Sequence, residues 1–129
     1  MSVPSTMRAL QRTSLNSPQD LRLITDAPVP SPGPGEVLIR VTAAGVNFVD
    51  ISQARGTFAG APQPPYLAGI EGAGEVTAVG EGVTDLEPGA HVSASASEAA
   101  PSPSTWCCLR LRRSACRRAG PTSRRWAWL

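Results

Sequence analysis

The sequence predicts a mainly β protein: a small, partly open barrel or sandwich with short helices and an irregular C-terminal tail. Two observations favour this fold class over a parallel α/β sheet. Short segments with alternating apolar and polar residues recur along residues 1–98, and Gly- and Pro-rich stretches separate them at close spacing. A segment of this length is large enough to bury a small core.

The first strands are expected at residues 7–13 and 21–25, on the N-terminal side. Residues 28–35 hold four prolines, which remove amide donors and fix φ, so this stretch is an extended connector that ends in a turn. Residues 36–46 alternate a fully apolar face with a mixed face, which predicts a strand with one buried face. The Pro-rich residues 59–66 predict a loop.

A short helix is expected at residues 47–56, with Asn47 as a candidate N-cap and Gly56 as the stop signal. Two further strands are expected beyond the loop. Residues 74–80 alternate again, and a turn-rich connection leads from them into a short strand at residues 91–93. With little helix and no internal repeat, these segments support the all-β interpretation.

The composition changes sharply after residue 98. Residues 1–98 hold five Arg and all ten acidic residues, which gives a net charge of −5. Residues 99–129 hold seven Arg and no acidic residue, which gives +7. The tail also contains every Cys and Trp of the chain, namely Cys107, Cys108, Cys116, Trp106, Trp126 and Trp128. We therefore divide the chain into a domain at 1–98 and a tail at 99–129.

Several protein classes do not fit this sequence. No apolar run approaches the ~18 residues that a transmembrane helix needs. The N-terminus lacks the basic-then-apolar pattern of a signal peptide. Three Cys, two of them adjacent, do not make a disulfide framework. The sequence therefore predicts a cytoplasmic, reduced protein without a membrane partner, and it leaves the oligomeric state open.

Two stretches carry a family resemblance: "PVPSPGPGEVLIRVTAAGVNFVD" and "GIEGAGEVTAVGEGVTDLEPGAHV". They closely resemble the N-terminal, GroES-like domain of the medium-chain dehydrogenase/reductases, and within that superfamily the zinc-free quinone oxidoreductase (zeta-crystallin-like) branch. The resemblance covers roughly residues 7–93. It implies a GroES-like, alcohol dehydrogenase-like N-terminal domain at 1–98, NADPH as cofactor, and hydride transfer to a small-molecule quinone or α,β-unsaturated carbonyl.

Zinc catalysis is excluded by the ligand chemistry. The zinc-dependent alcohol dehydrogenases of the superfamily have Cys where this chain has Asn47, and Gly-His-Glu where it has Gly69, Ile70 and Glu71. A catalytic zinc site needs three protein ligands with nitrogen, sulfur or carboxylate donors. Asn47 and Ile70 do not supply them, so the resemblance is to the zinc-free branch.

The resemblance also implies where substrate and nicotinamide lie. The residue that matches Asn47 is a hydrogen-bonding group near both, although Asn47 is equally suited to cap a helix, and the two roles are compatible. Asp50 matches the acid of the family's N-x-x-D, or is a first-turn acid that favours the helix dipole. Some members carry Tyr residues shortly after the Asn, and the approximate matches here are Ser52 and Phe58. No catalytic residue is assigned.

Two other features near these residues have plain structural interpretations. Glu71 is either a buried acid beside the site or a salt-bridged core acid, and we favour the second. Residues 72–77 begin like a G-x-G-x-x-G fingerprint but lack the third Gly and the strand-to-helix context. Gly72 and Gly74 are therefore expected to serve backbone turns. Since no helix N-terminus is available to hold a pyrophosphate, we expect little or no binding of NADPH.

The Arg-rich tail allows three interpretations. Its Arg and Trp residues could contact phosphates and stack on bases, which would make it a nucleic-acid-binding tail. Its Cys residues could bind metal, but they lack C-x₂-C spacing and His91 is the only His of the chain. The third interpretation is that the tail has no selected function, and the genetic code supports this one.

Reading the codons one frame over turns the tail into family-like sequence. Residues 100–109 then give Ala-Phe-Ala-Glu-Tyr-Val-Val-Leu-Pro, in which the second Val and the Leu are forced by Trp106, Cys107 and Cys108. Residues 124–129 give Ala-Ala-Leu-Gly-Leu-Ala, with the Gly forced. Both resemble the family's next strand and helix, so we infer a frameshift around residues 93–100.

The sequence thus predicts a truncated, frameshifted N-terminal catalytic domain of an NADPH-dependent quinone oxidoreductase-like enzyme, inactive as this chain. The alternative is a stand-alone GroES-like domain whose basic tail binds a partner or nucleic acid. Under the frameshift, the tail at 101–129 should lack regular packing. The barrel should then keep an unpaired edge and an exposed apolar seam.

Overall fold

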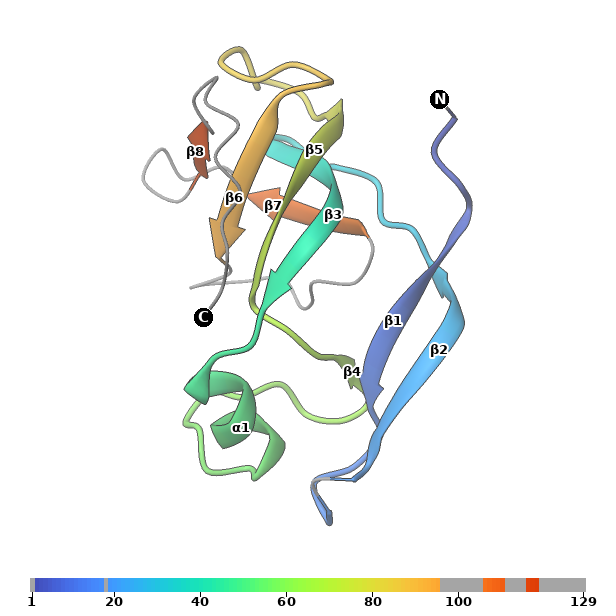
Figure 1. Cartoon of the computed structure of the whole chain (residues 1–129), viewed down its shortest axis with the longest axis vertical. Helices are drawn as coiled ribbons and strands as arrows, with labels where there is room; N and C mark the ends of the chain where they lie inside the picture. The colour runs from blue at the N-terminus through green and yellow to red at the C-terminus, as the bar shows by residue number, and fades with distance from the viewer. Residues whose placement is uncertain (1, 18, 96–105, 111–115, 119–129) are drawn as a thin grey trace.

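The structure is a computed structural model that describes residues 2–17, 19–95, 106–110 and 116–118. These residues form two antiparallel sheets and one short helix, and the sheets do not close into a ring, which confirms a mainly β, partly open fold (Figure 1). The elements are β1 (Thr6–Arg12), β2 (Leu21–Pro28), β3 (Glu36–Gly45), α1 (Phe48–Ala54), β4 (Tyr66–Leu67), β5 (Glu71–Val79), β6 (His91–Ser95), β7 (Trp106–Arg110) and β8 (Cys116–Arg118).

The first sheet has the strand order β2–β1–β4 and is built on the N-terminal hairpin. β1 and β2 pair antiparallel with a register shift near the start of β1, and β4 adds to the end of β1. The strands predicted at 7–13 and 21–25 are confirmed. The two-residue β4 was missed, because it begins at the end of the Pro-rich loop predicted at 59–66 and is too short to show alternation.

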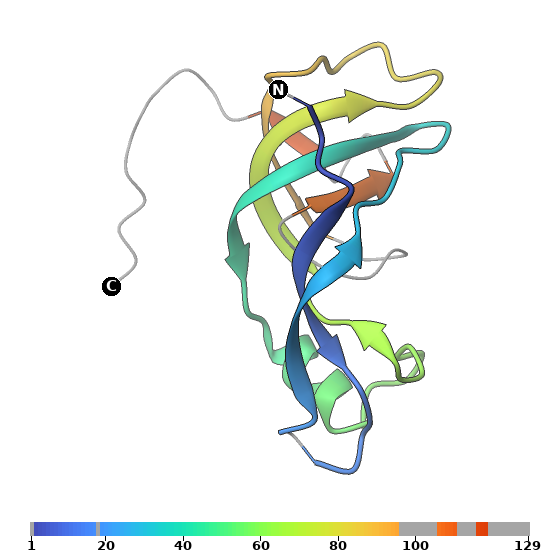
Figure 2. The same cartoon turned by 90° about the vertical axis from the view of Figure 1, so that its right-hand side faces the viewer.

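The second sheet has the strand order β7–β3–β5–β6–β8. Figure 2 shows that β3 and β5 bend strongly along their length, and they pair antiparallel along almost all of it. The strands predicted at 36–46, 74–80 and 91–93 are confirmed. β5 begins earlier than predicted, at Glu71, because a stretch with two glycines shows no apolar alternation yet still pairs through its backbone.

The prediction that β3 has one buried face is wrong, because both of its faces are covered. Val37 and Ile39, which are 0% and 1% exposed, face a cluster with Val76. Leu38, which is 2% exposed, points to the opposite face and packs against Met7 in β1 and its neighbours. The first sheet therefore lies over one face of the second and gives it a second core.

Gly72 and Gly74 lie inside β5 rather than in turns, which corrects the turn interpretation. A Cβ atom on Gly74 would overlap the backbone carbonyl oxygen of Arg40 in β3. Glycine is needed at this position because two backbones approach each other closely. At Gly72 the nearest atom to such a Cβ would be Val41 Cγ1 at 3.3 Å, so that site is less crowded.

The tail contributes two strands to the second sheet. β7 pairs antiparallel with β3, from Arg40 opposite Trp106 to Glu36 opposite Arg110, and β8 pairs with β6. The unpaired edge expected of the barrel is therefore not found where β7 pairs with β3, because strand pairing uses backbone groups that any sequence supplies. The packing expected for the rest of 101–129 falls outside the described residues.

Within the described part of the chain, no helix is both long and apolar enough to cross a membrane.

Candidate functional site

The turn from β3 into α1 presents Asn47 at one end of the molecule. Asn47 is the N-cap of α1 and has extended backbone angles, φ −116° and ψ 162°. The Asp50 Oδ2 atom accepts a hydrogen bond from the Asn47 backbone N–H at 2.7 Å, as in a capping box. The helix ends at Arg55 and is followed by Gly56, whose φ is +68°. Both the predicted cap and the predicted stop are confirmed.

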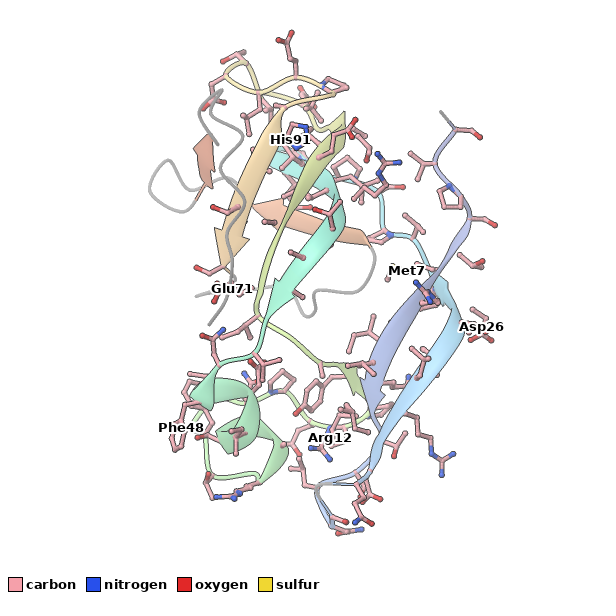
Figure 3. The ribbon with its side chains drawn as sticks, viewed as in Figure 1. Met7, Arg12, Asp26, Phe48, Glu71 and His91 are labelled. Carbon is pink, nitrogen blue, oxygen red and sulfur yellow. The ribbon has the colours of Figure 1, made fainter. Side chains whose placement is uncertain are left out.

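The side chain of Asn47 reaches across to the start of β5. Its Nδ2 atom donates a hydrogen bond to Glu71 Oε2 at 2.8 Å. Glu71 is exposed, so neither of the interpretations predicted for it, a buried acid or a salt-bridged core acid, is correct. The acid lies at the strand end, where no core surrounds it, and Figure 3 places it on the side of α1 nearer the sheets.

Gly45 makes room for the Glu71 carboxylate. The two residues are partners in the β3–β5 register. A Cβ atom at Gly45 would lie 2.9 Å from Glu71 Cδ, and its two carboxylate oxygens would be 3.0 and 3.1 Å away. Contacts this short are hardly tolerated, so the carboxylate can lie over this position only because residue 45 has no side chain. This role of Gly45 was missed, since a glycine at a strand end looks like an ordinary stop signal.

Asp50 has one satisfied carboxylate oxygen and one that is not. Its Oδ2 atom accepts the Asn47 N–H, whereas its Oδ1 atom is buried and has no hydrogen-bond partner among the described residues. Asp50 is acidic and lies in the first turn of α1, where a negative charge is favourable. The predicted first-turn acid is therefore present, and it holds Asn47 from the helix side while Glu71 holds it from the sheet side.

Ser52 and Phe58 do not join this hydrogen-bonded group. The backbone oxygen of Ser52 accepts hydrogen bonds from Thr57 N–H at 3.0 Å and from Thr57 Oγ1 at 3.2 Å, which closes the end of the helix. Phe58 follows in the next loop and is 42% exposed. The structure therefore brings together Asn47, Asp50 and Glu71, with Ser52 and Phe58 on the far end of α1.

The two residues next to Asn47 in the sequence have exposed apolar side chains. Val46 is 86% exposed and Phe48 is 76% exposed, and Figure 3 shows Phe48 on the outward side of α1. Ile51, one turn along, is 43% exposed, and within the described structure none of the seven residues of α1 is buried. Apolar residues flanking the N-cap were visible in the sequence, but their exposure depends on what α1 packs against. The site is thus a hydrogen-bonding amide between two exposed apolar side chains.

Among the described residues, no group of three or more His, Cys, Asp and Glu side chains could hold a metal ion. Nor do the described residues fit a dinucleotide. Gly72 and Gly74 lie inside β5, without a following helix, and α1 is a single short helix that begins after Asn47 rather than after a Gly-rich turn.

The sequence was compared with protein families and curated proteins. The family model described as the alcohol dehydrogenase GroES-like domain matches residues 33–125. A synaptic vesicle membrane protein VAT-1 homolog from Rattus norvegicus is 49% identical over 63 residues, which are 49% of this chain and 16% of that protein. A quinone oxidoreductase from Lama guanicoe is 41% identical over 86 residues, 67% of this chain and 26% of that protein. The chain thus spans about a quarter or less of these relatives.

Solved structures share the fold. A human VAT-1 homolog-like protein superposes with a TM-score of 0.78 at 30% identity, covering 89% of this chain and 35% of that one. The quinone oxidoreductase from Coxiella burnetii also gives 0.78, at 25% identity, covering 88% of this chain and 37% of that one. A mycobacterial protein complexed with NADPH gives 0.76 at 31% identity, covering 89% and 34%.

Proposed function

The chain belongs to the alcohol dehydrogenase GroES-like domain family, and we propose that it is the substrate-side domain of a zinc-free, quinone oxidoreductase-like enzyme. The match over residues 33–125 and the likeness to quinone oxidoreductases support this assignment. The reaction class is transfer of a hydride from NADPH to a quinone or an α,β-unsaturated carbonyl. The observation that carries the proposal is the amide of Asn47, held in an exposed turn between two apolar side chains.

Asn47 suits a carbonyl ligand because of its hydrogen-bond inventory. An amide nitrogen carries two hydrogens, and Asn47 Nδ2 uses one of them on Glu71. The second hydrogen is available to a ligand carbonyl oxygen, which is the group that gains negative charge when a quinone or enone is reduced. Val46 and Phe48 supply apolar area beside it for a flat ring. In this proposal Asp50 holds the backbone of Asn47 in place, and Ser52 in α1 and Phe58 in the loop after it line the ligand site.

This chain alone should not catalyse the reaction. The described residues offer no site for a pyrophosphate, so we expect no reaction of NADPH on this chain alone. Titration of the chain with NADPH should show no micromolar binding by fluorescence. Added Zn²⁺ should also have no effect on any activity, because Asn47 and Ile70 stand at the ligand positions. Micromolar NADPH binding would overturn this part of the proposal.

We attribute the basic tail at 99–129 to a change of reading frame around residues 93–100, which leaves the enzyme domain truncated. The shifted frame yields family-like sequence at both ends of the tail. Sequencing the gene downstream tests this. A stretch coding for a dinucleotide-binding domain in the shifted frame supports it. Its absence would favour the second candidate, a stand-alone domain with a nucleic-acid-binding tail. The net charge of +7 favours that candidate, which predicts strongly salt-dependent binding.

A ligand titration tests the carbonyl site directly. Duroquinone is a suitable probe, because every ring position carries a methyl group. The Cys thiols of the chain therefore do not add to its ring. We expect amide shifts in the ¹⁵N-labelled chain that centre on Asn47 and Phe48 and saturate at weak affinity. Asn47→Ser keeps a good helix cap but removes the amide, so it should abolish the shifts. The matched control is Asn16→Ser, in the exposed β1–β2 turn. Shifts that survive in Asn47→Ser contradict the proposal.

A further inference from the structure

Glu71 makes one side-chain hydrogen bond that the structure records, and it goes to the amide of Asn47. The acid is exposed and lies at the first position of β5, so its burial contributes little to the core. Its carboxylate nevertheless occupies a defined place, over Gly45 and within 2.8 Å of Asn47 Nδ2. Glu71 therefore has no role in core packing. Its defined position over Gly45 points to a role in its contact with Asn47.

We propose that Glu71 is a positioning residue, which fixes the orientation of the Asn47 amide so that its second N–H is presented to the carbonyl oxygen of a quinone or enone. The proposal deepens the function proposed above and rests on it for the identity of the ligand. It assigns to Glu71 a role in specificity: the site recognises a group that accepts a hydrogen bond and disfavours one that only donates, such as an ammonium.

The chemistry of the two groups supports this orientation. An ionised carboxylate only accepts hydrogen bonds, so it pairs with the NH₂ end of an amide and repels the carbonyl end. A hydrogen bond with one charged partner is about twice as strong as a neutral one, which disfavours the flipped amide. Asp50 fixes the backbone of the same residue by accepting its N–H at 2.7 Å. With its backbone and its amide both held, Asn47 has one geometry available for a ligand.

Gly45 provides an independent argument. Its φ is not in the left-handed region, so its backbone does not require glycine. An added Cβ would instead meet the Glu71 carboxylate, whose carbon would lie 2.9 Å away, so this flexible side-chain end would have to shift. Replacing Gly45 by Ala should therefore displace the carboxylate from Asn47 while leaving every atom of Glu71 present. The Gly45→Ala variant therefore tests the position of the Glu71 carboxylate without removing its negative charge.

The experiment compares four variants of the full ¹⁵N-labelled chain: Glu71→Gln, Glu71→Leu, Gly45→Ala and the control Glu81→Leu, which removes an exposed acid from a turn. Two readouts are recorded: the pair of Asn47 Nδ2–H signals, with their exchange rates, and the affinity for duroquinone. Thermal unfolding of each variant reports any loss of fold.

In the wild type, the two Nδ2–H signals should differ in shift, and one should exchange slowly. Glu71→Gln keeps an acceptor oxygen but loses the charge and can also donate, so it should weaken both readouts only in part. In Glu71→Leu and Gly45→Ala, the two Nδ2 hydrogens should exchange at similar rates. The affinity for duroquinone should fall about tenfold, which corresponds to the loss of one hydrogen bond. Glu81→Leu should behave as wild type.

Other outcomes overturn the proposal. Unchanged Nδ2–H signals in Glu71→Leu would show that Glu71 does not hold the amide. If Glu71→Leu and Glu81→Leu lose the same affinity for duroquinone, Glu71 contributes only through the net charge of the chain. If the wild type binds no duroquinone at all, the proposed function fails, while the Nδ2–H signals still decide whether Glu71 orients Asn47.

Discussion

The two ends of β3 are held by different forces. At the first end, Val37, Leu38 and Ile39 are between 0% and 2% exposed. The first sheet covers the Leu38 face, and residues of β5, β6 and the connection between them cover the other face. At the second end, the chain leaves the core and the turn is held by hydrogen bonds from Asn47 to Asp50 and Glu71. One end therefore carries the stability of the domain. The other end carries Asn47, a half-buried polar residue between two exposed neighbours.

The largest expected effect tests the buried end with a matched pair. Ile39→Ala should lower the free energy of unfolding by about 2–4 kcal/mol, since Ile39 is 1% exposed and its removal leaves a cavity. Ile51→Ala, in α1, should change it by less than about 0.5 kcal/mol, since Ile51 is 43% exposed. Urea denaturation followed by circular dichroism measures both. Equal losses would mean that α1 is packed in solution.

The next effect concerns the backbone contact between β3 and β5. Gly74→Ala places a methyl group against the Arg40 carbonyl oxygen, so the strands must move apart, at a cost of about 1–3 kcal/mol. Gly72→Ala, two residues away, meets Val41 Cγ1 at 3.3 Å and the Ala43 backbone oxygen at 3.4 Å, so it should cost much less. Thermal melts of the two variants compare them. A neutral Gly74→Ala would contradict the close approach.

The difference between the two ends of β3 also explains which structural features could be predicted from the sequence. Alternation located the strands, and the pattern Asn47…Gly56 located the helix and both of its ends. Alternation within one strand cannot show which other sheet will cover it, so the burial of Leu38 against β1 was missed. Likewise the partner of Glu71 depends on the β3–β5 register, which juxtaposes residues more than twenty positions apart.

For the candidate site, the sequence identified Asn47 and Asp50, whereas their mutual geometry came only from the structure. Ser52 and Phe58 were chosen by approximate alignment to aromatic positions, and the structure places them apart from the hydrogen-bonded group. Their place in the ligand site stays a prediction. The exposed apolar side chains of Val46 and Phe48 could not be inferred, since apolar residues beside a helix cap usually pack inward.

The third prediction tests whether apolar side chains in the tail strand would stabilise the domain, as they do at the buried end of β3. Residues 100–108 are replaced by Ala-Phe-Ala-Glu-Tyr-Val-Val-Leu-Pro, the shifted-frame sequence. Because β7 already pairs with β3, the exchange should gain apolar burial rather than a new ladder, and raise the free energy of unfolding by about 1 kcal/mol. It should also lower aggregation. Equal melts and equal aggregation would show that the natural tail already fills this place.

The smallest effect lies between the two ends of β3, at the ion pair of Arg40 and Glu75. Arg40 Nη2 and Glu75 Oε2 are 2.8 Å apart on neighbouring strands, and both side chains are 33% exposed. They are partners in the β3–β5 register, and Glu75 is in turn opposite His91 in β6. Solvent and salt screen such a pair, so we expect a coupling free energy of about 0.5 kcal/mol.

A double-mutant cycle with Arg40→Gln and Glu75→Gln measures this coupling, since each replacement keeps a polar side chain of similar length. The coupling should shrink when the salt concentration is raised from about 0.05 to about 0.5 M, because the Debye length then shortens to a few ångströms and exposed charges are screened more strongly. A coupling above about 2 kcal/mol that does not respond to salt would mean that this middle stretch of β3 is shielded from water. The strand would then change from burial to exposure only beyond Arg40, nearer to Asn47.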